Sequence, residues 1–296
     1  MTRLTRLLAP LAAAVAAALC TAPAAAEPTT TGTLPATSPA LVTTGWLAEN
    51  LDQPNLRILD ARNAMRAYQQ AHVPGAVYLN TESLRISRGG IPGRTLPPDD
   101  LARLFGAIGV GSGMDVVVYS GGDDLHSAAT YVAVLLEFLG HDRVAVLDGG
   151  WDQWKKEGRP TSSATPAVPE RRFAAAPREG MMLDADAVRR AAGQGAVMLD
   201  ARPADLHAAG RIPGSRNLPL AELLADGGKW KSPEELRAAA KQAGVEPGKP
   251  VVAYCNTGRE ASQLAFTLKH VLGIEDVRIY PGSMIDWKSR DLPLEP

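Results

Sequence analysis

The residue best suited to chemistry in this chain is Cys255. It follows the apolar run Val251–Tyr254, which we predict to be a buried strand. A short loop and then a helical pattern follow it, and open α/β sheets bind their ligands at such carboxyl ends of strands. The candidate binding residues of this loop are Asn256, Thr257, Gly258, Arg259 and Glu260.

A loop of this kind can stabilise a negative charge. The first N–H groups of a helix have no partner within it, and a curled loop aims them at one point. Gly258 lets the loop curl, and Arg259 adds a positive charge for an anionic substrate. Glu260 is unusual, because an acid facing the pocket would weaken anion binding. We therefore expect Cys255 to have a lowered pKa and to be nucleophilic near neutral pH; the alternative is a buried structural cysteine.

The elements around Cys255 belong to a unit that the chain contains twice. Five segments recur in the same order after about 135–140 residues, a period too long for a solenoid and typical of a domain duplication. The segments that begin at Leu59, His72, Pro98, Val116 and Asp148 recur at Leu199, Arg211, Pro233, Val251 and Pro281. We place the first copy at residues 41–160, a connector rich in Pro, Ser and Ala at 161–180, and the second copy at 181–296.

Residues 1–26 have the composition of a secretory signal peptide. Two arginines precede an apolar stretch that ends at Cys20, and Ala24–Ala26 supply the small residues that a signal peptidase reads. We predict cleavage before Glu27, a flexible leader over 27–40, and a periplasmic or secreted protein. The alternatives are a membrane anchor and a lipoprotein modified at Cys20. Cleavage would remove Cys20 and leave Cys255 as the lone thiol.

Short apolar runs alternate with helical patterns in each copy. The predicted strands of the second copy are Ala196–Leu199, Val251–Tyr254 and Val277–Tyr280, and its predicted helices are Ser232–Ala243 and Ala261–Leu272. This alternation predicts an α/β fold in which each copy has a mostly parallel sheet flanked by helices on both faces.

The ordered motifs resemble those of tandem-domain rhodanese-like sulfurtransferases. The resemblance covers nearly all of residues 41–296. It rests on the Leu-Asp-Ala-Arg strand ends, the Ile-Pro-Gly turn, the Tyr-Cys loop and the Gly-Ser-Met-Ile-Asp-Trp ending. It implies two rhodanese-like domains, of which the C-terminal one is active, and a loop cysteine, Cys255, that carries the transferred sulfur.

The first copy departs from the active pattern in the way this family implies. Ser120 stands at the position of Cys255, and a serine cannot form a persulfide. Asp123 and Asp124 follow it, so we expect the anion-binding loop to be lost. The first copy is then expected to pack on the second and to wall the active site.

The implied reaction is transfer of a sulfane sulfur from a small anionic donor to a thiophilic acceptor, cyanide or a thiol. We favour thiosulfate as the donor. Arg259 would orient its anionic end, Arg211 corresponds to a position near the family's active site, and Asp200 would brace a neighbouring loop. The alternatives are 3-mercaptopyruvate as donor, or a sulfur-carrier and binding module without turnover. An exported thiol also raises the possibility of a reducing partner protein.

Other functions are excluded or disfavoured by composition and spacing. The net charge of −1 argues against a nucleic-acid partner. A cysteine phosphatase needs an arginine six positions after the cysteine, and Ala261 stands there. The five histidines show no paired metal-ligand spacing, so we expect no metal. We also expect no cofactor, and no contact with a membrane after the signal peptide is cleaved.

Overall fold

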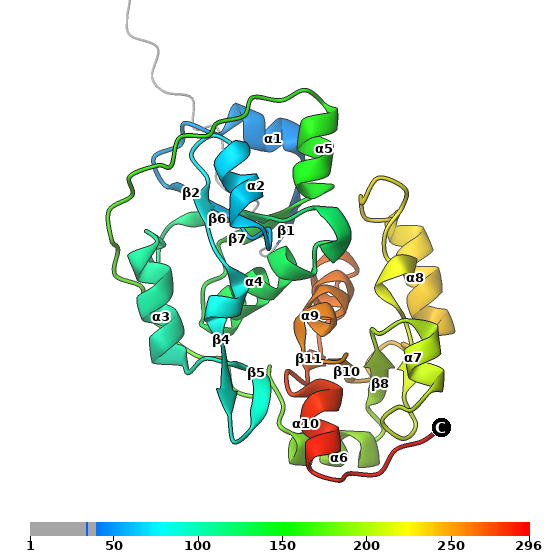
Figure 1. The fold of residues 1–296 in the computed structure, drawn as a ribbon. Coiled ribbons are helices and arrows are strands. Elements are labelled where there is room, and N and C mark those ends of the chain that lie inside the picture. Colours follow the sequence, from blue (N-terminus) through cyan, green and yellow to red (C-terminus); the bar gives the residue numbers. More distant parts are fainter. Residues whose placement is uncertain (1–33, 35–39) are drawn as a thin grey trace, which may run out of the picture. The chain divides into compact units, whose positions relative to one another are not determined.

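The structure is a computed structural model that describes Leu34 and residues 40–296 (Figure 1). The predicted signal peptide and almost all of the predicted leader lie outside the described residues, so both stay predictions. Within the described part of the chain, no helix is long and apolar enough to cross a membrane.

The first copy is built on a sheet of five strands in the order β1-β7-β6-β2-β3, and all neighbouring pairs are parallel. The strands are β1 (Ala40–Val42), β2 (Leu56–Asp60), β3 (Val77–Tyr78), β6 (Asp115–Tyr119) and β7 (Val144–Leu147). The helices are α1 (Thr44–Glu49), α2 (Met65–Gln70), α3 (Pro98–Ala107), α4 (Ser127–Phe138) and α5 (Gly150–Lys156), with the 3-10 turns η1 (Thr81–Leu84) and η2 (Gly122–Asp124).

Alternate residues of the central strands face opposite helical layers. Val117 and Leu147 pack in the cluster that contains Trp154 of α5. Val118 and Val146, one residue earlier or later, pack in the cluster that contains α3 and α4. Because successive side chains of a strand point to opposite faces, such a sheet buries both of its faces under helices. This arrangement confirms the predicted fold class.

The second copy repeats the plan with four parallel strands in the order β11-β10-β8-β9. The strands are β8 (Val197–Asp200), β9 (Arg216–Asn217), β10 (Val251–Tyr254) and β11 (Val277–Ile279). The helices are α6 (Ala185–Gly193), α7 (Ala204–Ala208), α8 (Pro233–Gln242), α9 (Arg259–Phe266) and α10 (Ser283–Ser289), with the 3-10 turn η3 (Leu220–Glu222). Helix α8 begins with a capping box, because Ser232 and Glu235 each accept the other's backbone N–H.

The helix predicted over Ala261–Leu272 differs at both ends. It begins two residues earlier, at Arg259, because Gly258 adopts the left-handed conformation that starts it. Its last part is the π-helical segment η4 (Thr267–Val271), in which Leu272 N donates to Thr267 O. Lys269 and His270 of this segment contact the buried Glu137 of α4, so the wider turn lies where the two copies meet.

An antiparallel hairpin in the first copy was not predicted from the sequence. It pairs β4 (Arg85–Arg88) with β5 (Ile91–Thr95). Gly89 and Gly90 form its tip with φ of 61° and 75°, which is the backbone that a tight two-residue turn needs. None of the hairpin residues is buried, so the segment lacks the apolar run on which strand prediction depends.

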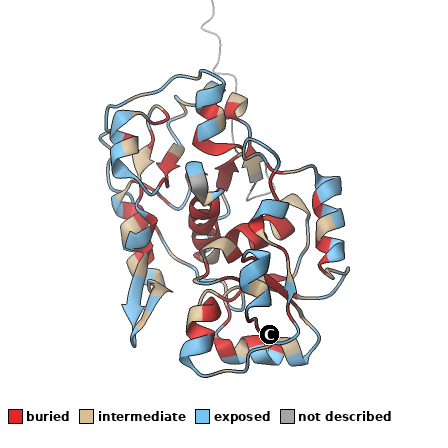
Figure 2. Ribbon diagram, turned by 45° about the vertical axis from the view of Figure 1, so that its right-hand side comes forward, coloured by how far each residue is buried: buried red, intermediate tan, exposed pale blue. Residues whose placement is uncertain are grey.

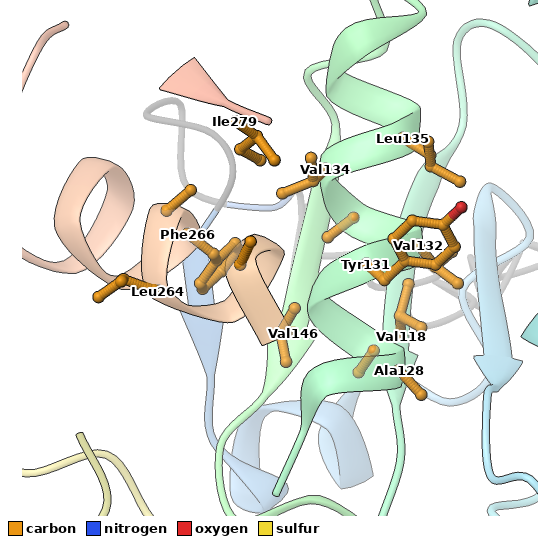
Figure 3. Close-up of a cluster of buried hydrophobic side chains, with 14 of the residues drawn as sticks. Val118, Ala128, Tyr131, Val132, Val134, Leu135, Val146, Leu264, Phe266 and Ile279 are labelled. Atoms are coloured by element: carbon orange, nitrogen blue, oxygen red, sulfur yellow. The ribbon is translucent and has the colours of Figure 1, made fainter. Parts of the chain in front are cut away.

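The two copies share one hydrophobic core. Helix α4 is buried on almost every side, as expected for a helix that is apolar all round (Figure 2). It packs on α9 of the second copy, and one cluster of buried residues continues across both. Figure 3 shows Val134 of α4 facing the helix that carries Leu264 and Phe266. The first copy therefore supports the helix that follows Cys255.

Candidate active site

Cys255 is the first residue after β10, and the loop from Asn256 to Gly258 joins it to α9. Gly258 has φ of 90°, and a Cβ at this position would lie 2.5 Å from the carbonyl oxygen of Pro281. Both facts require glycine here. The loop can therefore curl tightly only because residue 258 has no side chain.

The sulfur of Cys255 lies among backbone donors. Gly258 N donates to Sγ at 3.0 Å, and the N–H groups of Thr257 and Ala261 also favour the thiolate. The side chain is fully buried. The structure therefore contains the predicted N–H cradle, with the sulfur at its centre.

The predicted lowering of the Cys255 pKa is wrong. Complete burial, followed by the nearby negative charge of Glu260, raises the pKa of the thiol to about 11, and the backbone donors only partly offset this. Burial in a low-dielectric site disfavours the charged form of an acid. The sequence shows the donors of the cradle but not how completely the sulfur is removed from water.

Ser283 is a site residue that the sequence analysis missed. It accepts the backbone N–H of Cys255 at 3.0 Å, and its hydroxyl lies 3.9 Å from Sγ. It holds φ of 49°, which is uncommon for a residue other than glycine. The first copy has Gly150 at this place, also with positive φ. Comparison of the two repeats at this position was the signal that could have identified it.

Arg259 forms an ion pair with a residue of the first copy. Its guanidinium forms an ion pair with Glu82 of η1, and Arg85 at the start of β4 donates to the carbonyl oxygen of Thr257. Two residues far back in the chain thus contact the Cys255 loop directly. No motif pointed to either of them.

The other predicted site residues lie at different distances from the sulfur. Asn256 is exposed, and its carbonyl accepts Ile285 N at 3.1 Å. Arg211 pairs with Glu295 near the C-terminus, through both its side chain at 3.0 Å and its backbone. The contacts of Arg211 therefore run to the C-terminal segment and not to the Cys255 loop.

Asp200 holds the segment after β8. Its carboxylate accepts the backbone N–H and the guanidinium of Arg202, with the shortest contact at 2.6 Å, and both side chains are buried. Arg202 also donates to Gly210 O at 2.8 Å. Asp60 and Arg62 make the same contacts in the first copy. Through these contacts, Asp200 and Arg202 hold the loop after β8 in place.

In the corresponding loop of the first copy, the acceptor is a carboxylate, that of Asp124. Ser120 follows β6, and its hydroxyl donates to the carboxylate of Asp124 at 3.0 Å. The same carboxylate accepts His126 N at 2.8 Å. Among the described residues, no group of three or more His, Cys, Asp and Glu could hold a metal ion.

Comparison with known proteins identifies the family. The model of the rhodanese-like domain matches twice, at residues 43–157 and 184–290. A putative thiosulfate sulfurtransferase of Synechococcus elongatus is 38% identical over 267 residues, with 84% of this chain and 83% of the relative covered. The sulfur carrier protein TtuD of Thermus thermophilus is 28% identical, with 83% and 93% covered.

A solved structure agrees with these matches. The crystal structure of SseA from Escherichia coli, described as showing the rhodanese fold of 3-mercaptopyruvate sulfotransferases, superposes with a TM-score of 0.75 and 28% identity. The match covers 82% of this chain and 98% of that one. Both copies of the repeat are therefore rhodanese-like domains, and the chain belongs to the family of tandem-domain rhodanese-like sulfurtransferases.

Proposed function

We propose that this protein transfers a sulfane sulfur from a small anionic donor to a thiophilic acceptor through a persulfide on Cys255. The observation that carries the proposal is the position of Sγ, fully buried at the end of β10 and 3.0 Å from the N–H of Gly258. A negative charge on sulfur is stabilised by such donors, whether it belongs to the thiolate or to the terminal sulfur of a persulfide.

The reaction has two displacement steps. The Cys255 thiolate attacks the outer sulfur of thiosulfate, the sulfur–sulfur bond of the donor breaks, and sulfite leaves with the electron pair. The acceptor then attacks the outer sulfur of the persulfide. With cyanide, thiocyanate is released and the Cys255 thiolate returns, so no external oxidant or reductant is needed. Covalent catalysis of this kind divides one transfer into two easier ones.

Thiosulfate is the donor we favour. The site lies beside two guanidinium groups, those of Arg259 and Arg85, which suit a doubly charged anion better than a singly charged one. The identity to a putative thiosulfate sulfurtransferase supports the same choice. 3-Mercaptopyruvate remains the alternative donor, supported by the likeness to SseA.

A sulfur-carrier role is the second candidate. The resting thiol is fully buried with a raised pKa, which slows its attack on small donors in solution. The identity to the sulfur carrier protein TtuD supports this reading. A carrier would take up persulfide sulfur from a partner protein and show no repeated turnover with a small donor.

Parallel steady-state assays with thiosulfate and with 3-mercaptopyruvate, each with cyanide as acceptor, test these proposals. We expect turnover with a higher kcat/KM for thiosulfate, and a loss of at least about a thousandfold in Cys255→Ser. Full activity of Cys255→Ser would contradict the mechanism. Absence of turnover with either donor, together with sulfur uptake from a protein persulfide, would favour the carrier.

We also propose that the protein is exported and acts in the periplasm or outside the cell, where a reducing partner protein would keep Cys255 reduced. The signal-like composition of residues 1–26 supports this location. N-terminal sequencing of the protein from a periplasmic extract should begin at Glu27. A mature chain that retains residues 1–26 in the cytoplasm would contradict the proposal.

A further inference from the structure

The Cys255 loop is contacted by a pair of charged residues from the copy that lacks the thiol. Arg85 donates to Thr257 O, and Glu82 pairs with Arg259. Glu82 also lies 3.8 Å from Arg85. One carboxylate therefore stands between two guanidinium groups at the edge of the active-site loop.

The two guanidinium groups are held in place, whereas the carboxylate is not. The Arg85 side chain is 7% exposed; it donates to Gly93 O at 3.1 Å and lies over the ring of Tyr131. The Arg259 side chain is 18% exposed, and Glu82 is 59% exposed. An exposed ion pair is weak, so Glu82 can leave at small cost.

Arg259 has unused hydrogen-bonding capacity toward an anion. Its Nε is buried, and no acceptor among the described residues contacts it. A guanidinium has five N–H donors in a fixed plane, and a planar or tetrahedral oxyanion can use two of them at once. The present carboxylate thus leaves part of this capacity unused.

We propose that Glu82 competes with the sulfur donor: its carboxylate occupies the anion position formed by Arg259 and Arg85, and a sulfur donor binds there by displacing it. This inference rests on the proposed function, because it assumes that an anionic donor approaches the Cys255 loop. A tethered carboxylate competes at a high effective concentration with any ligand for the same position.

A competitor that must be displaced weakens the binding of every ligand for that position by the same factor. The preference for a dianion such as thiosulfate over a monocarboxylate such as 3-mercaptopyruvate comes from the two guanidinium groups, since the Coulomb energy grows with charge. Glu82 therefore raises KM for both donors to the same extent.

The test is Glu82→Gln, assayed with both donors. Loss of the competing charge should lower KM by about two- to fivefold, the range for an exposed ion pair, with kcat unchanged. The decrease should be the same for 3-mercaptopyruvate, so the preference for thiosulfate is unchanged. In an Arg259→Gln background the same change should lower KM by less, because only Arg85 then remains beside Glu82. An unchanged or raised KM in Glu82→Gln, or an undiminished effect without Arg259, overturns the proposal.

Glu246→Gln is the matched control. Glu246 is also 59% exposed and pairs with a basic residue, Lys249, at 2.8 Å, outside the contacts of the Cys255 loop. The control removes the same charge and should leave KM unchanged for both donors. An equal decrease in the control would show that total charge alone is responsible, which also overturns the proposal.

A binding experiment separates this inference from the proposed function. In a Cys255→Ser background no sulfur can be transferred, so calorimetric titration with sodium thiosulfate reports anion binding alone. Adding Glu82→Gln should tighten the Kd by about two- to fivefold. Absence of turnover in the wild type together with this tightening would refute sulfur transfer but keep the anion position. Normal turnover with an unchanged Kd would refute the role of Glu82 alone.

Discussion

The loops after β6 and β10 share a backbone hydrogen bond to the segment after the next strand, but their N–H groups have different acceptors. Trp151 N donates to Ser120 O at 2.8 Å in the first copy, and Met284 N donates to Cys255 O at 3.0 Å in the second. In the second copy the loop N–H groups point to a sulfur. In the first, the N–H of His126 points to the carboxylate of Asp124, a residue of the same loop.

The anion-binding loop of the first copy therefore has a different length, and its His126 N–H already has an acceptor. Helix α9 begins at Arg259, four residues after Cys255, whereas α4 begins at Ser127, seven residues after Ser120. Within the longer loop, the carboxylate of Asp124 accepts both the Ser120 hydroxyl and the His126 N–H. Burial raises the pKa of Asp124 to about 6, so this carboxylate is held at some cost. Loss of the thiol is therefore only one of two changes that separate the copies.

The largest effect on this comparison should come from Gly258→Ala. A Cβ would meet Pro281 O at 2.5 Å on a backbone with φ of 90°, so the loop must open and its N–H must leave the sulfur. We expect sulfur transfer to fall by about a hundredfold, the usual loss when one donor to a developing anion is removed. Steady-state assays with thiosulfate measure it.

Gly248→Ala is the control for backbone strain alone. Gly248 has φ of 76°, and nothing lies within 4 Å of the position of its Cβ. It should lose about 1 kcal/mol of stability and no activity. Equal losses of activity in the two variants would show that the close approach of Gly258 to Pro281 has no role.

Glu260→Gln should change the pH dependence of the Cys255 thiol, which the first copy lacks. The thiol pKa of about 11 means that attack by Cys255 should accelerate about tenfold per pH unit from neutrality up to that value. Glu260 raises this pKa, so its neutralisation should move the profile to lower pH and increase the rate at neutrality. The profile is obtained by alkylating the folded protein at several pH values and measuring, by mass spectrometry, how fast the peptide that contains Cys255 is modified. A shift to higher pH would contradict the account.

A smaller effect is expected from Asp124→Asn, on stability. The pKa of this group is raised in the folded state from 3.8 to about 6, so its favourable contribution is present below about pH 4 and lost as pH rises through about 6. The variant should therefore be more stable than the wild type by about 1 kcal/mol near pH 8, and not near pH 4. Thermal unfolding at both pH values checks this. Equal stability differences between variant and wild type at the two pH values would mean that ionisation of the buried Asp124 carboxyl carries no cost.

Ser120→Cys should have the smallest effect. Asp124 already accepts the N–H of His126 and Asp152 that of Gly122, so a new thiol there would lack a cradle. We expect no persulfide at residue 120 and unchanged turnover. A second persulfide after exposure to thiosulfate would show that the loops differ only in the thiol.

Much of the fold could be predicted from the sequence because its signals are local. The run Val251–Tyr254 is apolar throughout, and the Ser-Pro-Glu-Glu start at Ser232 gives a capped helix, so both elements lie where expected. The duplication then placed Cys255 opposite Ser120. These are patterns that one segment of chain carries by itself.

The site was predicted less completely because its remaining features are not local. Glu82 and Arg259 are 177 residues apart in sequence and meet only through the packing of the two copies. Burial, which sets the pKa of Cys255, depends on the whole fold. Arg211 was assigned because, at its place before the Pro-Gly turn, it corresponds to a position near the family's active site, whereas its partner, Glu295, lies in the C-terminal segment.

The most direct test of the central claim is to map the persulfide after a single exposure of the full-length protein to thiosulfate without acceptor. Peptide mass spectrometry should find one added sulfur atom, on the peptide that contains Cys255, and cyanide should remove it with release of thiocyanate. A wild-type protein that turns over thiosulfate while the Cys255 peptide never gains sulfur would contradict the account.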